Sequence, residues 1–421
     1  MQISKQKVPD IAIEKLGLAM GEIEGDPIEE MARYGTRLIL TSYLQAEVEA
    51  HLRAMPYERT EARRGSRNGI RERTVACGIG GVTVEYPKVR DSEEPFRSQV
   101  LEAWQRKSRT LLGAIPALYV EGLSTRDYGR ALKDLWHGAG MSRSTVSRAN
   151  EQLKVAFDKW RRRSLAEEEI VYLFLDGHYE GVRQGTSGKE AILVAHGIGN
   201  DGKHVLLGVY LGNHEDTQSW KLALNDLEGR GLKRPVMVIS DGNAGLIRAV
   251  REKWQKIARQ RCIVHRIRNV LARIPKSEHG LIRKELNRIF YAPSLDEALA
   301  AAKTFAQKWQ NKYPNAVEVL GTDLEDCLTF FRMPQRHWKR IRTSNTIERL
   351  FLEVRRRTRV IGRFPNERAA LSLIWSVLDQ DTARWRRMTM DAEHLQKVQE
   401  GVESLTVNPI KVIGFEELFA A

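Results

Sequence analysis

Two kinds of apolar pattern alternate along the middle of the chain. Residues 170–175 (IVYLFL) and 235–240 (PVMVIS) are dominated by apolar side chains without polar alternation, which is typical of strands buried on both faces. Residues 191–199 and 204–212 are two further strand-like runs, separated by the turn sequence Asn-Asp-Gly, and they predict an antiparallel hairpin. From residue 170 onward the pattern therefore predicts an α/β structure built around a sheet.

Helical spacing of apolar residues recurs between and after these strands. Residues 216–231 predict a helix that ends at its glycines, and residues 244–254 predict a second helix, followed by a short strand near residues 259–265. Three strands, a helix, a fourth strand, a helix and a fifth strand form the element order of the ribonuclease H-like fold. Residues 266–335 are mostly helical in pattern and rich in Lys, Arg, Ala and Leu.

A strongly amphipathic helix is predicted over residues 343–360. Its inward-facing stripe consists of Ile347, Leu350, Phe351 and Val354. With successive residues about 100° apart on a helix, Glu348 lies at one edge of that stripe. The neighbouring face carries Asn345, Arg355 and Arg359.

The first hundred residues are predicted to form a separate module, placed at residues 1–100. Residues 26–52 predict one amphipathic helix, and residues 57–74 form a basic stretch punctuated by glycine, which predicts a loop. Residues 74–89 then predict two short strands about a glycine-rich turn.

Residues 108–163 are helical in pattern and contain a candidate helix-turn-helix. A short helix over residues 124–132 is followed by a glycine turn at residues 137–140, and Ser142 caps a second helix. This arrangement fits helix-turn-helix proteins that read DNA, although an ordinary helical hairpin fits it as well. The solvent-facing residues of the second helix, which are candidate DNA contacts, are Arg143, Thr145, Ser147 and Arg148.

The charge balance narrows the choice of partner. The chain of 421 residues carries 68 Lys and Arg against 54 Asp and Glu, a formal net charge of +14, and this excess favours a polyanionic partner. No apolar run approaches the roughly 18–20 residues of a membrane-spanning helix, and the N-terminal sequence has no signal-peptide pattern, so nucleic acid is favoured over membrane. Cys77, Cys262 and Cys327 are odd in number and far apart, which fits a reducing cytoplasm without disulfide bonds.

An Asp-Gly pair follows both central apolar runs, at Asp176-Gly177 and Asp241-Gly242. In open α/β sheets, ligands bind outside the carboxyl ends of the strands, and a glycine after each aspartate permits close approach of the backbone. Asp-Gly is also simply a favourable turn sequence. Two such pairs, on strands predicted to be neighbours, favour a shared site over two unrelated turns.

Glu348 is the third candidate because of its setting. The arginines around it, which suit a phosphate backbone, are Arg349, Arg355, Arg356, Arg357 and Arg359. Three carboxylates brought together repel one another unless a cation intervenes. Mg²⁺ or Mn²⁺ meets that need because both prefer oxygen ligands, and two ions about 3.5–4 Å apart can activate a water or a 3′-hydroxyl for attack on a phosphodiester.

Four sequence blocks between about residue 60 and about residue 390 match a known family. They are LFLDG, VISDG, QRCIVHRIRN and, most specifically, RTSNTIERLFLEVRRRTRVIGRFPNE. With them the sequence resembles the Mutator-type transposases of bacterial insertion sequences, whose active site is an Asp-Asp-Glu triad. The resemblance implies that the triad is Asp176, Asp241 and Glu348. A helical insertion domain, as the family has, explains the long separation between the last two residues.

The resemblance further implies a DNA transposase that binds terminal inverted repeats in double-stranded DNA. It implies strand cleavage and strand transfer with two Mg²⁺ or Mn²⁺ ions per active site, a homodimer on DNA, no membrane partner, and a place in the bacterial cytoplasm, at the nucleoid when bound to DNA. Two alternatives stay open on the residues alone. One is a metal-dependent nuclease that only hydrolyses DNA, and the other is a DNA-binding regulator with an inactive site.

The predicted architecture is α/β, with a ribonuclease H-like catalytic core and an all-helical insertion behind a mainly helical DNA-binding region. The segments are a helical and β-hairpin module at 1–100, a helix-turn-helix region at 101–165, a catalytic domain at 166–265 and 336–400, a helical insertion at 266–335 and a C-terminal tail at 401–421.

Cys262 and His265 have the spacing of half a zinc site, but the sequence has no second Cys/His pair at suitable spacing. The Mutator-type transposases carry a Cys-x-x-His motif here, so His265 is a candidate for contacting DNA or positioning the scissile strand, and equally a candidate for a packed core residue. Trp309 and Trp338 pose a similar choice between stacking on an unpaired base and packing within the helices, and packing is favoured for Trp309.

Overall fold

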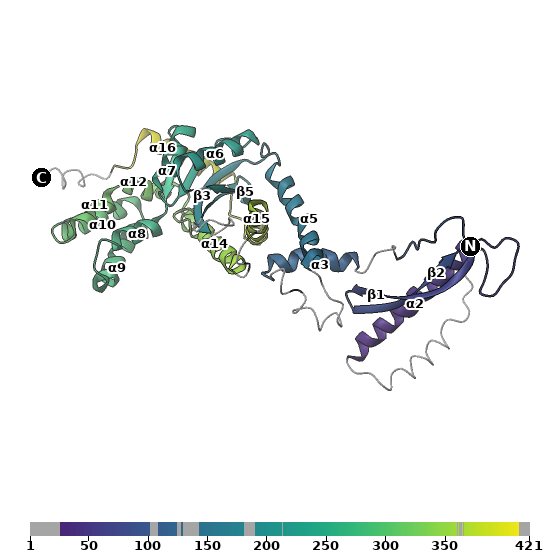
Figure 1. Ribbon diagram of the computed structural model, residues 1–421. Helices are drawn as coiled ribbons and strands as arrows, with labels where there is room; N and C mark the ends of the chain where they lie inside the picture. The colour runs from purple at the N-terminus through teal and green to yellow at the C-terminus, as the bar shows by residue number, and fades with distance from the viewer. Residues whose placement is uncertain are drawn as a thin grey trace. The chain divides into compact units, whose positions relative to one another are not determined.

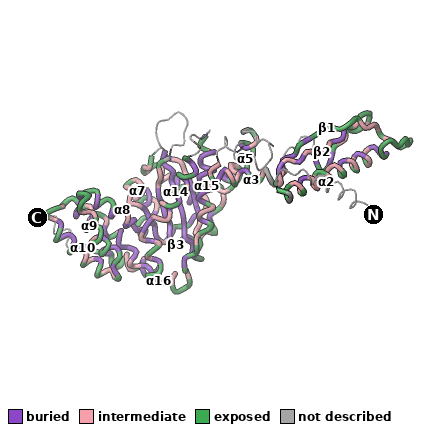
Figure 2. The backbone as a smooth tube through the Cα atoms, turned by 90° about the horizontal axis from the view of Figure 1, so that it is seen from below, coloured by how far each residue is buried: buried purple, intermediate pink, exposed green. Residues whose placement is uncertain are grey.

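The computed structural model describes residues 26–101, 108–123, 128, 143–180, 190–212, 214–359, 361, 364 and 366–411. The chain divides into two compact units, Met1–Gln152 and Leu153–Ala421. Figure 1 labels the helices and strands of both, and Figure 2 shows that the buried residues concentrate in the sheet of the second unit. None of the described helices is long and apolar enough to cross a membrane.

A β-hairpin packed against one long helix forms the core of the first unit. Helix α2 (Pro27–Leu52) begins after Asp26, whose carboxylate accepts a hydrogen bond from Ile28 N at 2.9 Å and so acts as the N-cap. Strands β1 (Ser66–Cys77) and β2 (Gly80–Arg90) pair antiparallel, and α2 packs against β2. The buried residues between them are Leu44, Val75, Val82, Val84, Tyr86 and Leu101.

The prediction of a loop over residues 57–74 is wrong for its second half, because β1 begins at Ser66. This half is mostly exposed, so it lacks the apolar alternation by which a strand is recognised in sequence. Its strand conformation comes from the ladder to β2. Arg71 and Arg73 also lie over the ring of Tyr86, at 5.8 and 5.4 Å from its centroid, a cation–π arrangement that covers apolar surface with charged side chains.

Helices α3 (Arg109–Val120) and α5 (Arg143–Arg161) follow. The first helix and the turn of the predicted helix-turn-helix, residues 124–140, lie outside the described residues except for residue 128. The motif therefore stays a prediction.

A five-stranded mixed sheet in the order β5-β4-β3-β6-β7 forms the centre of the second unit. Strand β3 runs antiparallel to β4 and parallel to β6, while β4 is antiparallel to β5 and β6 is parallel to β7. The strands are β3 (Ile170–Glu180), β4 (Glu190–Gly199), β5 (His204–Gly212), β6 (Met237–Ser240) and β7 (Ala258–Arg261). The predicted succession of strands and helices is confirmed.

Of the described helices of this unit, some pack beside the sheet and others form a group off one end of it (Figure 1). They are α6 (Thr217–Gly229), α7 (Ala244–Lys253), α8 (Ile263–Leu271), α9 (His279–Phe290), α10 (Leu295–Trp309), α11 (Pro314–Gly321), α12 (Leu324–Leu328), α13 (Gln335–Ile341), α14 (Asn345–Thr358), α15 (Glu367–Ala383) and α16 (Ala392–Val407), with the short 3₁₀ helices η2 (Lys276–Glu278) and η3 (Thr329–Arg332). The mostly helical pattern predicted for residues 266–335 is confirmed as secondary structure.

The two faces of β3 have different neighbours. Leu173 and Leu175 belong to the apolar core that includes the buried residues of α6 and α7. Because side chains alternate along a strand, Tyr172 points to the opposite face, where its hydroxyl lies 2.8 Å from Nδ1 of His337 in α13. Asp176 has the same parity as Tyr172, so it lies on this second face.

The helices after β7 pack on one another, with α9 against α10 and α8 against α11. Trp309 is 6% exposed, and its indole N–H donates to Glu285 at 2.6 Å. The indole N–H of Trp338 donates to the carbonyl of Met333 at 2.8 Å. Both tryptophans are thus packed within the helical layer.

Gly202, in the turn between β4 and β5, fixes a distant segment of the chain. Its φ is +75°, a Cβ there would lie 1.8 Å from the carbonyl oxygen of Met388, and the backbone N–H of Met388 donates to Gly202 O at 2.8 Å. We predict that Gly202→Ala lowers the free energy of unfolding, since strained backbone alone costs about 1–3 kcal/mol and the overlap adds to that. Urea denaturation followed by tryptophan fluorescence measures the change.

Gly229→Ala is the matched control, because a Cβ at this helical position meets nothing within 4 Å. Gly229→Ala should raise the free energy of unfolding by about 0.5–1 kcal/mol, as expected for alanine in place of helical glycine. Equal effects of the two substitutions would contradict the packing described for Gly202.

Candidate active site

Asp176 and Asp241 are brought together by the parallel pairing of β3 with β6. The last registered pair of that ladder is Leu175 opposite Ser240, so each aspartate is the next residue of its chain. The prediction that both aspartates end their strands is wrong for Asp176, because β3 continues to Glu180. It continues because β4 still supplies hydrogen-bond partners after β6 has ended.

The side chain of Asp176 is almost completely buried. Only 4% of the residue is exposed, and Oδ1 accepts a hydrogen bond from Gly177 N at 2.9 Å. Burial raises the pKa of this carboxyl group well above its ordinary value, and nearby charges, those of Asp241, Glu215 and Glu348 among them, raise it further. Carboxylates from three other parts of the chain therefore act on Asp176.

A tight turn holds Asp241 after β6. Its Oδ1 accepts a hydrogen bond from Asn243 N at 2.9 Å, and Asn243 Oδ1 in turn accepts one from Leu246 N at 3.0 Å as the N-cap of α7. Gly242 has φ +97°, and a Cβ there would lie 2.2 Å from Nε of Arg261. Only glycine fits this left-handed position, so the Asp-Gly sequence here serves both the turn and the placement of Asp241.

Glu348 enters the site from the first turn of α14. Its Oε1 lies 3.3 Å from Nε2 of His265, and its Oε2 lies 3.9 Å from Nη2 of Arg268. Helix α14 packs against β3, with the rings of Phe351 and His178 stacked at 4.9 Å. The apolar stripe predicted for this helix is buried, and its burial turns Glu348 toward the aspartates.

Cys262 and His265 connect the end of β7 to the start of α14. The backbone N–H of Cys262 donates to Ser240 O at 2.8 Å, and its Sγ accepts a hydrogen bond from Ser344 N at 3.3 Å. Burial raises the pKa of the Cys262 thiol, but hydrogen bonds and the charge of His265 outweigh burial and lower it overall. Burial lowers the pKa of His265, but Cys262 and neighbouring carboxylates outweigh burial and raise it. His265, beside Glu348, therefore keeps a positive charge to higher pH than an unperturbed histidine.

Glu215 is a fourth carboxylate at the site, which the sequence analysis missed. Its backbone N–H donates to Tyr179 Oη at 3.3 Å, and its carbonyl accepts from Asn243 Nδ2 at 3.3 Å. A Cβ on Gly177 would lie 2.5 Å from Cδ of Glu215, so this glycine leaves room for the carboxyl group. Burial, and then the charge of Asp241, raise the pKa of Glu215 to about 7. No local pattern marks Glu215, because its spatial neighbours come from other segments.

The α14 residues predicted to contact DNA lie on more than one side of the helix. Nη2 of Arg355 is 3.4 Å from Nε2 of His178, so Arg355 lies on the side of the helix that faces the acidic site. Asn345, the first residue of α14, is half-buried.

Other arginines of α14 have different surroundings. Arg349 and Arg359 are exposed, and Arg356 is exposed while forming an ion pair with Glu353 at 3.1 Å. Arg357 is only 5% exposed and pairs with the same glutamate. The expectation that Arg357 suits a phosphate backbone is therefore wrong, because its guanidinium is packed inside the protein.

The DNA-contact candidates of α5 lie at its N-terminal end. Ser147 and Arg148 are exposed and Thr145 is half-buried, while the side chain of Arg143 lies outside the described part. Their exposure is compatible with a contact surface.

The donor atoms of the site are of the kind that a hard divalent cation prefers, although they do not surround one common point. Within the described residues, no group of three or more His, Cys, Asp and Glu side chains is arranged to hold a metal ion. Asp176 and Asp241 each accept a backbone hydrogen bond on Oδ1. Glu215 Oε1 and Glu348 Oε1 are buried without a hydrogen-bond partner. Buried, mutually repelling carboxylate oxygens are the donor set that Mg²⁺ and Mn²⁺ prefer.

The repulsion predicts that Asp176→Asn stabilises the metal-free protein. The folded-state pKa of Asp176 is raised, so its contribution to stability is present at acidic pH and is lost as the pH rises above the ordinary value for aspartate. In EDTA at pH 8, we expect the amide to raise the free energy of unfolding by about 1 kcal/mol, with a smaller gain at pH 5.

Asp201→Asn is the control, since the pKa of Asp201 is lowered instead, burial being outweighed by Lys203. It should destabilise rather than stabilise at pH 8. Thermal unfolding of the three proteins measures the differences, and an Asp176→Asn variant less stable than the wild type at pH 8 would contradict the charge balance described here.

Comparison with known proteins assigns the chain to a family. Residues 14–388 match the description "Transposase, Mutator family". The transposase for insertion sequence element ISRM5 of Rhizobium meliloti (strain 1021) is 35% identical over 350 residues, 83% of this chain and 87% of that protein. The transposase for IS6120 of Mycolicibacterium smegmatis is 38% identical over 283 residues, 67% of this chain and 86% of that protein.

The transposase for IS256 in transposon Tn4001 of Staphylococcus aureus is 32% identical over 343 residues, 81% of this chain and 87% of that protein. A solved structure, the Drosophila P element transposase strand transfer complex, covers 72% of this chain and 92% of its own at 12% identity, with a TM-score of 0.28, too low to bear on the fold. The length of the family match and the identity to these insertion-sequence proteins are sufficient: the chain belongs to the Mutator family of transposases.

Proposed function

We propose that this protein is a DNA transposase that binds the terminal inverted repeats of an insertion sequence and cleaves and joins DNA strands. Its active site would be the Asp-Asp-Glu triad Asp176, Asp241 and Glu348, with two Mg²⁺ or Mn²⁺ ions. The observation that carries the proposal is the burial of Asp176 among the charges of the other two, in a chain of a transposase family.

We propose a ribonuclease H-like core for the second unit. Supporting this is the strand order β5-β4-β3-β6-β7, in which an antiparallel meander precedes two parallel strands. The proposed organisation keeps the hairpin module at 1–100, the helix-turn-helix region at 101–165, the catalytic domain at 166–265 and 336–400, the helical insertion at 266–335 and the tail at 401–421.

In the proposed site, Asp176, Asp241 and Glu348 would hold the ions. When bound, two such ions supply activation of a water or 3′-hydroxyl and stabilisation of the leaving oxygen of a phosphodiester. The chain's own contribution is orientation: Gly177 N and Asn243 N each fix one oxygen of an aspartate.

His265 would act as a positioning residue for Glu348, from 3.3 Å away. Its raised pKa keeps positive charge beside the glutamate over a wider pH range, and this charge offsets repulsion among the carboxylates.

The substrate in this proposal is double-stranded DNA. Asn345, Arg355 and Arg359 would contact the phosphate backbone near the triad, Arg349 and Arg356 would extend this contact along α14, and Arg143, Thr145, Ser147 and Arg148 of α5 would contact the transposon end. A homodimer is expected on DNA, because two ends must be held together for transfer.

Triad variants test the assignment of the site. Asp176→Asn, Asp241→Asn and Glu348→Gln should each lower cleavage of transposon-end DNA at least about 100-fold, since losing even an outer partner of a metal ligand costs about 10–100-fold. Glu252→Gln, which removes an exposed carboxylate that pairs with Lys221 and Arg248, should cleave like the wild type. Wild-type cleavage by any triad variant would remove that residue from the site.

Strand transfer distinguishes a transposase from a nuclease with the same metal chemistry. A pre-cleaved end carrying a free 3′-hydroxyl should be joined to target DNA in Mg²⁺ or Mn²⁺, and gel electrophoresis would detect the joined product. Hydrolysis without joined product would favour the nuclease, and specific end binding without any cleavage would favour a regulator with an inactive site.

A further inference from the structure

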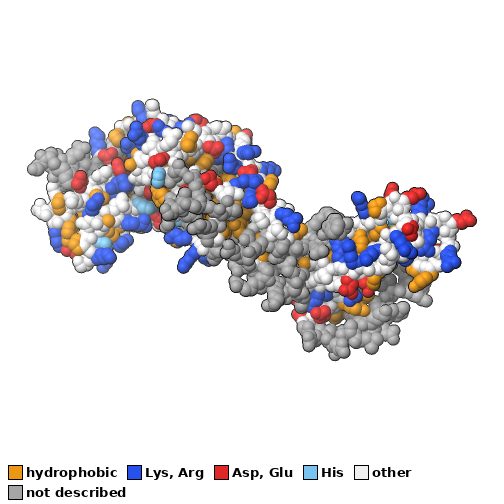
Figure 3. All heavy atoms as spheres, in the orientation of Figure 1, with side chains coloured by type: hydrophobic (Ala, Val, Ile, Leu, Met, Phe, Trp, Pro, Cys, Tyr) orange, Lys and Arg blue, Asp and Glu red, His pale blue; other side chains and the backbone are white. Residues whose placement is uncertain are grey.

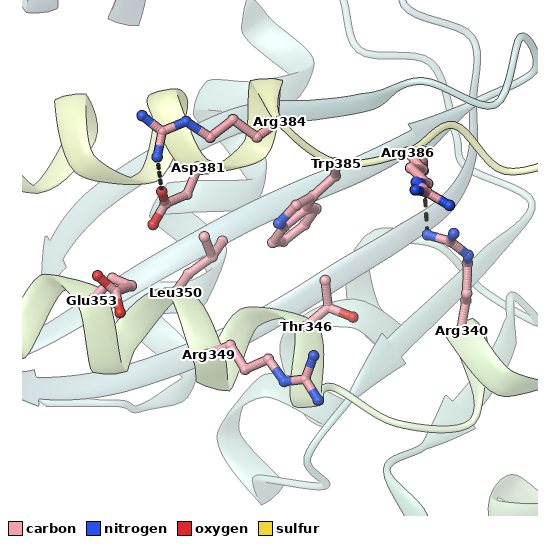
Figure 4. A pocket seen from close by; sticks show the side chains of 9 residues that line it. All are labelled: Arg340, Thr346, Arg349, Leu350, Glu353, Asp381, Arg384, Trp385 and Arg386. Atoms are coloured by element: carbon pink, nitrogen blue, oxygen red, sulfur yellow. Dashed lines mark hydrogen bonds and ion pairs between the residues drawn. The ribbon is translucent and has the colours of Figure 1, made fainter.

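Helix α14 separates the acidic site from a cavity on its other side. Successive residues of a helix are about 100° apart, so Thr346, Arg349, Leu350 and Glu353 share one face, and Glu348 points away from it. These four residues line a cavity of about 490 Å³ (Figure 4). The cavity is therefore distinct from the triad, although both depend on the same helix.

The end of α15 and the segment after it supply the opposite side of the cavity, with Asp381, Arg384, Trp385 and Arg386. The segment is anchored nearby, since Met388 pairs with the backbone of Gly202 as described above. Arg340 of α13 completes the lining, and its Nη1 donates to the carbonyl of Arg386 at 3.3 Å.

Positive charge dominates the cavity. Four arginines line it against two carboxylates, and both carboxylates already have cationic partners. Glu353 pairs with Arg356 and Arg357, while Asp381 lies 3.6 Å from Arg384. Within the described residues, Arg349 and Arg386 form no ion pair. The cavity thus has guanidinium groups available for an anion.

Trp385 gives the cavity an aromatic surface. Its ring makes T-shaped contacts with His196 and His204, at centroid distances of 5.1 and 5.0 Å. Burial lowers the pKa of both histidines, and with the added charge of Arg340 that of His204 falls to about 4. Both histidines that contact Trp385 are therefore uncharged at neutral pH, and they hold the indole by packing. Figure 4 shows the indole lying between the arginines of the cavity.

We propose that this cavity binds one unpaired nucleotide of a DNA strand, with its phosphate on Arg349 and Arg386 and its base against Trp385. The choice of DNA rests on the proposed function. A volume of about 490 Å³ lies within the roughly 300–1,000 Å³ of small-ligand sites and suits one nucleotide. Arginine contacts to phosphate and stacking of a base on an aromatic ring are the usual elements of single-strand binding.

The experiment uses the full chain in EDTA, so that no metal-dependent step contributes. A single-stranded oligonucleotide of roughly ten nucleotides, with 2-aminopurine at one position, reports affinity by anisotropy of an attached dye and stacking by quenching of the 2-aminopurine. Trp385→Ala should abolish the quenching and weaken binding about tenfold, because stacking on one aromatic contributes substantially to single-strand affinity. Trp385→Phe should retain most of both.

Charge variants test the phosphate contacts. Arg349→Ala and Arg386→Ala should each weaken strand binding and reduce the slope of log affinity against log salt by about 0.7, the value for one phosphate contact on a single strand. Arg248→Ala is the matched control, because Arg248 is an arginine of α7 that is 74% exposed and lies outside the cavity. It should change the affinity and the salt slope less than the cavity variants do.

Several outcomes would overturn the proposal. They are cavity variants that bind like Arg248→Ala, undiminished quenching in a folded Trp385→Ala variant, losses for Trp385→Ala and Arg386→Ala that are equal on blunt duplex and single strand, or displacement of the strand by inorganic phosphate at comparable concentration. Strand binding is measured in EDTA, so it does not require the metal-dependent step of the triad. Triad variants that still cleave DNA would therefore contradict the proposed active site, and the strand-binding result would be unaffected.

Discussion

The parallel ladder between β3 and β6 is the constraint on which the rest of the site depends. It ends at Leu175 opposite Ser240, and so sets the first aspartate beside the second. The connection after β7 then joins Ser240 to Ser344 through Cys262, which fixes the start of α14 relative to the same strand end. In this account, backbone register rather than side-chain attraction brings the carboxylates together, because the carboxylates themselves repel.

That repulsion is a cost the fold sustains. The charges of Asp241, Glu215 and Glu348 raise the pKa of Asp176, and the charge of Asp241 raises that of Glu215. Within the described residues, His265 is the basic side chain nearest to Glu348. Sites that accumulate uncompensated charge are typically functional, since folding alone would select against them. The proposed metal ions would relieve the cost, which links stability of this region to its occupancy.

The sequence predicted the strands and helices that have a regular pattern of buried apolar residues. It did not reveal the features that depend on contacts between distant segments. The apolar runs before Asp176 and Asp241 and the stripe of α14 were readable because buried faces leave a period in the sequence. The extension of β3 to Glu180 and the strand from Ser66 were not, since each depends on a partner strand. Glu215 and the cavity at Trp385 join residues distant in sequence, and Arg357 looked like its exposed neighbours although its side chain is buried.

The proposed active site requires the triad residues to be ligands of divalent metal ions. Anomalous scattering from crystals of the protein bound to end DNA and Mn²⁺ tests it most directly, because the signal locates each ion without reference to activity. We expect Mn²⁺ peaks within about 2.0–2.6 Å of carboxylate oxygens of Asp176, Asp241 and Glu348, the usual range for hard cations and oxygen. Saturating Mn²⁺ with no peak at these residues, or with peaks only elsewhere, would contradict it.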